Sequence, residues 1–350
     1  MPKPSYDSEA HFQALYESVP RRFAFKAKTP AELKAWQGKF RPRLREALGV
    51  TNMQRDLAGH KPKAEKAEAT DLGDYLREKW YLWTEPDVPL PFWLLVPKGA
   101  TGRRPLVLTP HGHNDPDIYV GLPKNEQQKL SIAEGQRDIA VQAVREGYVT
   151  IAPTTRGFGE TRTNRDREED KGCSCRTELL HGLLVGRTAI GQRVWDISRL
   201  IDWAAKRDDV DGSRIAITGN SGGGTTSLFA GACETRITVA VPSCYFCTFA
   251  GSIGTIHHCD CNYVPGVMRL GEMYDVAGLI APRAFCAIAG KDDGIFPIKH
   301  VREAFAQVKR VYEVAGVPER CRLYVGQGGH RYYSAGAWPF IKKWFGGKRW

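Results

Sequence analysis

Residues 214–223 read Arg-Ile-Ala-Ile-Thr-Gly-Asn-Ser-Gly-Gly, and this stretch predicts a strand that ends in a tight turn. The apolar run stops at Gly219, and Ser221 stands at the centre of a Gly-x-Ser-x-Gly pattern. Small neighbours let a strained backbone close beneath a serine, so that its hydroxyl stands clear. Residues 224–232 favour a helix whose N-terminus would stabilise a developing oxyanion. We therefore predict that Ser221 is a nucleophile on a strand–turn–helix.

A nucleophilic serine needs a histidine base and an acid that orients the base, and both follow in the chain. The apolar strand expected at 283–290 runs directly into Asp292 and Asp293. His330 follows the strand-like residues 322–325 through a glycine-rich turn. Because the carboxyl ends of parallel strands meet at one edge of a sheet, we expect these groups to lie near the serine. Either aspartate can be the acid, and either can instead cap the following helix.

The stretch after the apolar strand 104–109 is a candidate oxyanion loop. In a site of this kind one oxyanion donor is the backbone N–H after the nucleophile, here that of Gly222. The second donor comes from the loop after an earlier strand, and the backbone N–H of His113 is our candidate. His111 and His113 resemble metal ligands by residue type, but two histidines so spaced in a loop are more often structural.

Strands alternate with helices from residue 104 onward, which predicts an α/β fold with a mostly parallel central sheet and helices on both faces. Two earlier strands at 75–84 and 92–97 should form its antiparallel start. We divide the chain into an N-terminal helical extension, 1–70, packed on a catalytic domain, 71–350. The other expected elements are strands at 148–153 and 214–219 and helices at about 134–146, 189–207 and 298–314.

Two segments interrupt the alternation, at 156–188 and 245–275. Both follow strand ends on the expected active-site edge, so they could form the substrate pocket or a lid. Arg156, Tyr245 and Phe246 are the candidate pocket residues. The aromatic rings would stack on a sugar or fill a small satellite core, and a structural ion pair is the alternative role for Arg156.

The formal charge of +11 is concentrated at the start of the chain, because residues 1–70 hold 14 Lys and Arg against 8 Asp and Glu. No nucleic-acid recognition motif accompanies this charge, so we expect a solvated basic face and no nucleic-acid partner. No apolar run of about 18 residues is present, and no membrane span is expected. The N-terminus lacks the apolar stretch of a signal peptide, which favours a cytoplasmic protein.

The nine cysteines cannot all pair within one chain, and without a secretory signal they are expected to be reduced. They gather as Cys173-x-Cys175, Cys244-x-x-Cys247 and Cys259-x-Cys261, the last preceded by two histidines. A zinc site needs four tetrahedral ligands, commonly with Cys-x₂₋₄-Cys spacing, and only one of these clusters has it. We therefore predict no bound metal and no cofactor.

On these motifs the chain resembles the α/β-hydrolase superfamily over about residues 75–346. The elbow 211–224 is similar to that of acetyl xylan esterase-like, dienelactone-hydrolase-like and prolyl-oligopeptidase proteins. The spacing Gly290-x-x-Asp293-x-x-x-Pro297 matches the acid loop of those families, which implies Asp293 as the acid. The segments 245–266 and 280–283 resemble a bacterial group described as acetyl xylan esterases.

This resemblance implies a serine carboxylic ester hydrolase that works through an acyl-enzyme and removes acetyl groups from a carbohydrate. The expected partner is a small-molecule or glycan ester, no cofactor is implied, and no oligomeric state is predicted. A glucuronoyl-type esterase is one alternative, although its elbow carries arginine where this chain has Gly222. The others are a prolyl-oligopeptidase-like peptidase and a non-catalytic binding protein on the same scaffold.

Overall fold

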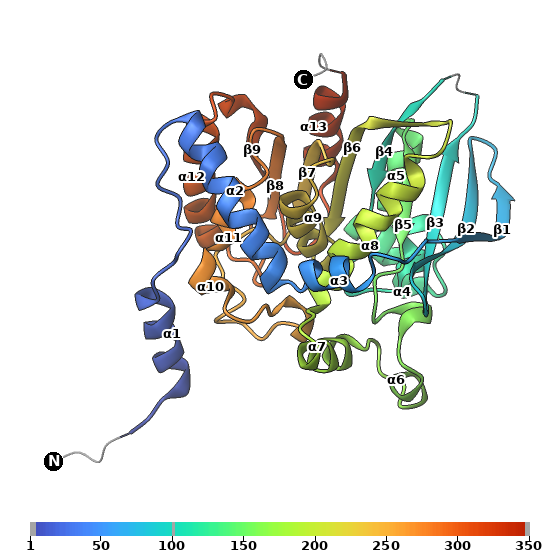
Figure 1. Ribbon diagram of the computed structural model, residues 1–350. Helices are drawn as coiled ribbons and strands as arrows, with labels where there is room; N and C mark the ends of the chain where they lie inside the picture. The colour runs from blue at the N-terminus through green and yellow to red at the C-terminus, as the bar shows by residue number, and fades with distance from the viewer. Residues whose placement is uncertain (1–4, 100–101, 347–350) are drawn as a thin grey trace.

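The computed structural model describes residues 5–99 and 102–346, and one sheet runs through the whole of it (Figure 1). The strand order is β1-β2-β3-β5-β4-β6-β7-β8-β9. Neighbours from β5 to β9 pair in parallel, whereas β1, β2, β3 and β5 pair antiparallel. The strands are β1 (Ala64–Asp71), β2 (Tyr75–Glu85), β3 (Val88–Pro97), β4 (Arg104–Leu108), β5 (Val149–Pro153), β6 (Val210–Asn220), β7 (Val239–Ser243), β8 (Ala284–Gly290) and β9 (Cys321–Gly326). The predicted mostly parallel α/β sheet is confirmed.

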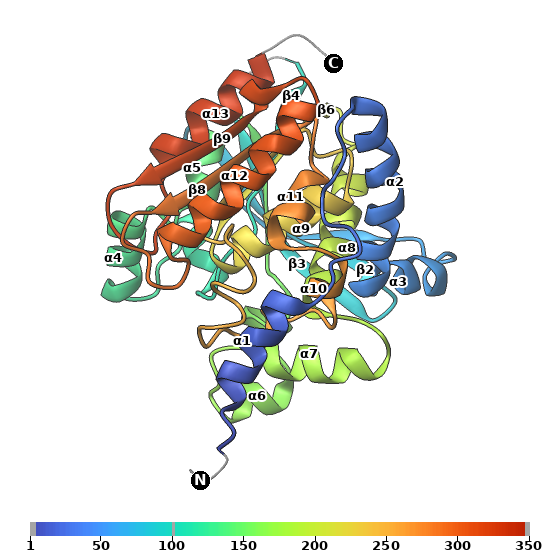
Figure 2. The same cartoon turned by 90° about the vertical axis from the view of Figure 1, so that its left-hand side faces the viewer.

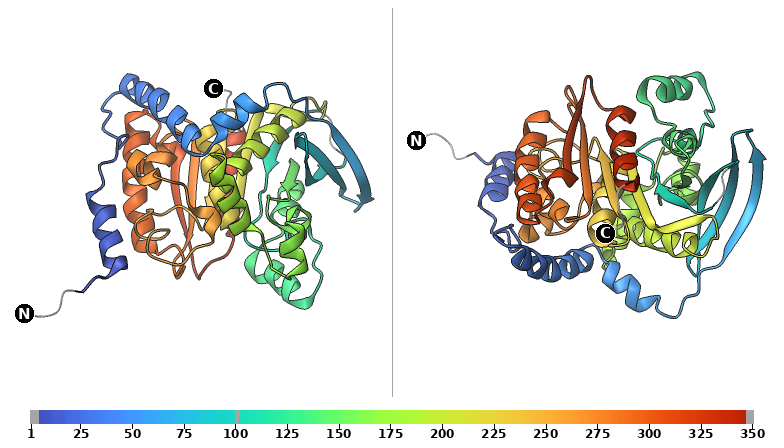
Figure 3. Two further views of the ribbon diagram at one scale, coloured as in Figure 1. Left: turned by 60° about the horizontal axis from the view of Figure 1, so that its bottom comes forward. Right: turned by 90° about the horizontal axis from the view of Figure 1, so that it is seen from above.

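Helices cover both faces of the sheet (Figures 2 and 3). One face packs against α8, α9 and α12, and the other against α5 and α13. The helices are α1 (Ser8–Ser18), α2 (Pro30–Ala47), α3 (Val50–Asp56), α4 (Glu126–Gly135), α5 (Ile139–Arg145), α6 (Asn164–Glu168), α7 (Cys175–Leu184), α8 (Ala189–Ala204), α9 (Gly222–Cys233), α10 (Val267–Leu270), α11 (Met273–Gly278), α12 (Ile298–Val314) and α13 (Ser334–Gly346). None of these helices is long and apolar enough to cross a membrane, within the residues that the structure describes.

The central strands are apolar throughout because each of their faces is buried. In β6, Ile215 and Ile217 enter the core beneath α8 and α9. Ala216 between them enters the second core, with α5 and α13. Successive side chains of a strand point to opposite faces, so one uninterrupted apolar run supplies two cores.

The N-terminal segment differs from the predicted helical extension, because β1 begins at Ala64 and adds an edge strand to the sheet. Its sequence, Ala-Glu-Lys-Ala-Glu-Ala-Thr-Asp, has no strand-forming pattern, and pairing with β2 creates the strand. The helix predicted at about 134–146 is also two helices, α4 and α5. They separate at Gln136, which has a φ of +52°.

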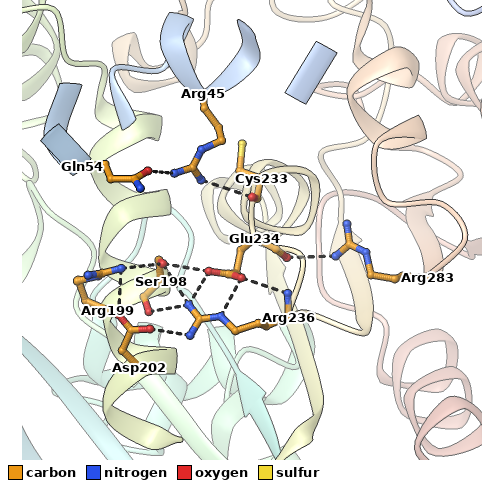
Figure 4. A network of polar contacts seen from close by, with 9 residues as sticks. All are labelled: Arg45, Gln54, Ser198, Arg199, Asp202, Cys233, Glu234, Arg236 and Arg283. Atoms are coloured by element: carbon orange, nitrogen blue, oxygen red, sulfur yellow. Dashed lines mark hydrogen bonds and ion pairs between the residues drawn. The ribbon is translucent and has the colours of Figure 1, made fainter. Parts of the chain in front are cut away.

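Three arginines hold the carboxyl end of α9, the helix that begins directly after Ser221. Arg41 of α2 donates to the Ala232 carbonyl at 2.9 Å, and Arg45 donates to that of Cys233 at 3.5 Å. Arg283 donates to the carbonyls of Gly231, Glu234 and Ile237 at 2.7, 3.1 and 2.6 Å. Figure 4 shows Arg45 at the Cys233 carbonyl and Arg283 at the Glu234 carbonyl, and the Glu234 carboxylate accepts from Arg236. The last carbonyls of a helix have no partner within it, so the arginines supply the missing donors and complement the helix dipole.

We expect Arg283→Met to lower the free energy of unfolding by about 2–4 kcal/mol, because buried carbonyls at the end of α9 lose a charged donor. Urea unfolding followed by circular dichroism measures the change. Arg310→Met on the exposed face of α12 is the matched control and should stay within about 0.5 kcal/mol of wild type. Equal stability of the two variants would contradict the role given to Arg283.

Candidate active site

Ser221 occupies a strained turn between β6 and α9, with φ +58° and ψ −118°. Its own N–H donates to the Ser243 carbonyl at 2.9 Å, which ties the turn to β7. A Cβ on Gly223 would lie 2.1 Å from the Pro110 carbonyl oxygen, and a Cβ on Gly219 would lie 2.3 Å from the same atom. Both glycines are therefore needed for the loop after β4 to pass directly against the turn.

Asp293 and His330 form a hydrogen-bonded pair, with 2.8 Å between Oδ2 and Nδ1. The Asp293 side chain is fully buried, and its Oδ1 accepts from the backbone N–H groups of Ile295 and Phe296. Burial raises the pKa of this carboxyl, but His330 and the two N–H donors more than offset that effect and hold the pKa below its usual value. Asp292 is exposed, so the carboxylate that contacts the histidine is that of Asp293.

Ser221 and His330 line one cavity of about 320 Å³ at the N-terminus of α9. Its lining is rich in hydrogen-bonding groups, and the side chain of Phe296 stacks on the His330 ring at 5.9 Å. The other lining residues are His113, Asn114, Arg137, Gly222, Thr225, His257, His258, Cys259, Asn262 and Ile295. A small polar ester group fits this space and this chemistry.

Gly222 and His113, whose backbone N–H groups are the predicted oxyanion donors, both line this cavity. Gly222 is the first residue of α9, where a helical N–H has no partner within the helix. A Cβ on Gly222 would lie 3.0 Å from His113 Cε1, so the His113 ring packs directly over it. The neighbouring N–H of Gly112 is already used, because it donates to the Tyr119 hydroxyl at 2.9 Å.

His111 has a structural role. Its Nε2 accepts from the Thr155 N–H at 2.9 Å, and its Nδ1 lies 2.6 Å from the Gly112 carbonyl oxygen. Burial lowers the pKa of this imidazole to about 3, so the ring is neutral at physiological pH. It joins the loops that follow β4 and β5.

The three side chains predicted to form the substrate pocket lie elsewhere. Arg156 is buried in ion pairs with Glu85 at 2.6 Å and Asp196 at 2.7 Å, the structural alternative considered above. Tyr245 and Phe246 are each 1% exposed and belong to the main core. They directly follow β7, a central strand covered on both faces, so their rings fill the layer beneath the cavity.

The cavity instead takes polar side chains that the sequence did not single out. Asn262 accepts from Thr225 of α9 at 3.0 Å, and Arg137 donates to Asn114 at 2.5 Å. Burial lowers the pKa of His258 to about 4, and its Nε2 lies 3.0 Å from the Ser252 hydroxyl. The adjacent histidines at 257–258 could have identified the insertion 245–275 as part of the cavity lining. No sequence pattern around Arg137 indicates that it lines the cavity.

Two of the three cysteine clusters meet in the structure, whereas the third lies elsewhere. Cys175, Cys259 and Cys261 come together beside the side chain of His113. Cys244 lies against the Asp293–His330 pair and donates to the Arg331 carbonyl at 3.1 Å. All nine cysteines are free thiols in the structure.

Comparison with known proteins relates the sequence of this chain to an esterase family. The family described as acetyl xylan esterase (AXE1) matches residues 87–263. A Bacillus subtilis (strain 168) protein named as a hydrolase, YtaP, is 26% identical over 265 residues, which are 73% of this chain and 83% of YtaP.

Two solved structures share the fold at 18% identity. One is a Bacteroides fragilis NCTC 9343 protein described as an acetyl xylan esterase, with a TM-score of 0.76 over 96% of this chain and 85% of that one. The other is a glucuronoyl esterase from Solibacter usitatus, with a TM-score of 0.67 over 99% of this chain and 100% of that one.

We expect Asp293→Asn to destabilise the protein in a pH-dependent way. The folded-state pKa lies below the unfolded value, so the ionised carboxylate stabilises the fold above about pH 4. That contribution disappears as the pH falls through the folded-state pKa. Urea unfolding of wild type and variant between pH 7 and pH 2 should show a stability gap that narrows only below about pH 4.

Asp292→Asn is the matched control, because its side chain is exposed and its substitution should stay within about 0.5 kcal/mol of wild type. A gap that is constant with pH for Asp293→Asn would show that the carboxylate charge contributes nothing to the fold.

Proposed function

This chain belongs to the acetyl xylan esterase family, and we propose that it removes acetyl groups from a carbohydrate through Ser221, His330 and Asp293. Family membership makes it a carboxylic ester hydrolase. The matched segment, 87–263, contains Ser221 and the loop of His113. The observation that supports the serine mechanism is that His330, paired with the buried Asp293, lines the same cavity as the strained Ser221.

The proposed reaction begins with proton transfer. Asp293 accepts the hydrogen bond from Nδ1 of His330, which leaves Nε2 free to take the proton of the Ser221 hydroxyl. The serine oxygen attacks the ester carbonyl, and the N–H groups of Gly222 and His113 stabilise the oxyanion. His330 then protonates the departing alcohol. Water attacks the acyl-enzyme by the reverse path and releases acetate.

The surroundings of Gly222 favour a deacetylase over a glucuronoyl esterase. A glucuronoyl-type elbow carries arginine after the serine, but here a Cβ at that position would lie 3.0 Å from both Cε1 and Nδ1 of His113. The imidazole of His113 takes the space that such a side chain would need. Polar groups at the cavity, including Arg137 and Asn262, are suited to the hydroxyls of a sugar.

We expect Ser221→Ala to lower kcat for p-nitrophenyl acetate by at least about 10³-fold, because the nucleophile is lost. Wild type should prefer acetate over longer acyl chains and should release acetate from acetylated xylan. The exposed Ser213→Ala is the control and should retain full activity. Undiminished turnover in Ser221→Ala would contradict the serine mechanism. Faster cleavage of a methyl glucuronate ester than of any acetyl ester would favour the glucuronoyl esterase alternative.

We also expect Gly222→Ala to lower kcat by about 10²–10³-fold, because the added methyl displaces His113 and with it one oxyanion donor. KM should change little, because the N–H group binds the neutral carbonyl of the ground-state ester more weakly than the oxyanion of the transition state. Steady-state kinetics separate the two constants. Gly212→Ala, where a Cβ meets nothing within 4 Å, is the matched control. A normal kcat in Gly222→Ala would contradict the proposal that the His113 N–H is an oxyanion donor.

A further inference from the structure

Four side chains with metal-binding atoms converge next to the cavity. Nε2 of His113 and Sγ of Cys175, Cys259 and Cys261 all lie within 4.8 Å of one another. His113 Nε2 is 3.1 Å from Cys261 Sγ. A tetrahedron with bonds of about 2.3 Å has edges of about 3.8 Å, so each pair of atoms needs to move closer or further apart by at most about 1 Å to share one ion.

The four residues come from three segments that are distant in the sequence. His113 is in the loop after β4, Cys175 is the first residue of α7, and Cys259 and Cys261 flank the start of a short 3₁₀ helix at Asp260–Asn262. Figure 1 shows α7 and α10 at the same end of the sheet, and α7 contacts the 3₁₀ helix at Asp260–Asn262, so the two insertions meet there. Cys175 and Cys261 are buried, with exposed fractions of 1% and 0%.

A buried cation beside this cluster, Arg193, forms no direct ion pair with a carboxylate among the described residues, although Glu178 lies near enough for their charges to interact. Arg193 of α8 is 3% exposed, and its Nη2 lies 3.6 Å from Cys175 Sγ. Its other hydrogen bond reaches the Arg156 carbonyl at 3.4 Å, and its Nε has no partner among the described residues. A buried guanidinium needs negative charge nearby, and neutral thiols supply none.

We infer that His113, Cys175, Cys259 and Cys261 bind one Zn²⁺ ion, and that this ion fastens both insertions to the loop of His113. Three cysteines and one histidine are a common ligand set of structural zinc. Three thiolates and one Zn²⁺ carry a net charge of −1, which Arg193 balances. Four protein ligands leave no open position, so the ion holds structure and does not bind substrate.

This site would fix the histidine whose backbone faces the catalytic serine. The His113 ring binds the cluster through Nε2 while its Cε1 and Nδ1 pack over Gly222. The consequence for turnover rests on the proposed function, but binding of the metal does not. The reduced thiols predicted from the sequence are found in the structure. The inferred zinc differs from the sequence prediction of no metal, because only the fold shows that two of the cysteine clusters meet.

The test is metal analysis of the purified full-length protein. We expect about one zinc per chain by inductively coupled plasma mass spectrometry. After replacement by Co²⁺, the absorption spectrum should show tetrahedral cobalt–thiolate bands. Cys261→Ser should hold less than about a tenth of the zinc. Cys173→Ser tests the choice of ligands, because this half-exposed thiol contacts Cys175 and Cys259 but lies outside the four-ligand set, so its loss should leave the zinc in place.

Misfolding of Cys261→Ser would not show whether the protein binds zinc, so a second measurement uses the wild-type protein. A chelator should remove the zinc and lower the melting temperature, and added Zn²⁺ should restore both. A metal-free protein that takes up no Zn²⁺, or one in which any of these three cysteines is held in a disulfide, would overturn the site. Loss of zinc from Cys173→Ser but not from Cys261→Ser would overturn the ligand set. Neither readout depends on esterase activity.

Discussion

The fold depends on how closely the loop after β4 approaches the serine turn. The Pro110 carbonyl lies where a Cβ on Gly219 or Gly223 would be, at 2.3 and 2.1 Å. No side chain is compatible with such distances, so the two glycines set how near the loop can come. The proposed oxyanion donor, three residues further along this loop, takes its position from that contact.

The strain of this turn is compensated by the helix that follows. A residue such as Ser221 at a φ of +58° costs of order 1–3 kcal/mol. All twelve residues of α9 are buried, and burying Leu228 and Phe229 alone contributes about 1.5–3 kcal/mol each. The helix can remain buried because its carboxyl end has charged donors and its amino end opens to the cavity. The same packing that stabilises α9 therefore also directs the amino end of its dipole toward the cavity that Ser221 lines.

The sequence predicted those parts of the candidate site that depend on short stretches of neighbouring residues. The elbow around Ser221 and the order serine, aspartate, histidine were readable because each group directly follows an apolar strand. The residues that line the pocket could not be predicted in this way, because an aromatic pair such as Tyr245 and Phe246 has the same sequence pattern whether it lines a cavity or fills a core. Strand β1 was missed for a related reason, because only pairing with β2 makes its Ala-, Glu- and Lys-rich residues extended.

The arginine contacts between α2 and α9 have a consequence for synthesis of the chain. Arg41 and its carbonyl partner, Ala232, are 191 residues apart. At translation rates of about 5–20 residues per second, α2 waits roughly 10–40 s for that partner. During this interval the apolar side chains of Leu33, Phe40 and Leu44, all buried in the finished protein, have no core to enter. The nascent chain therefore exposes these apolar side chains at least until residue 232 has been added, and Arg41 gains its second carbonyl partner only with Leu279.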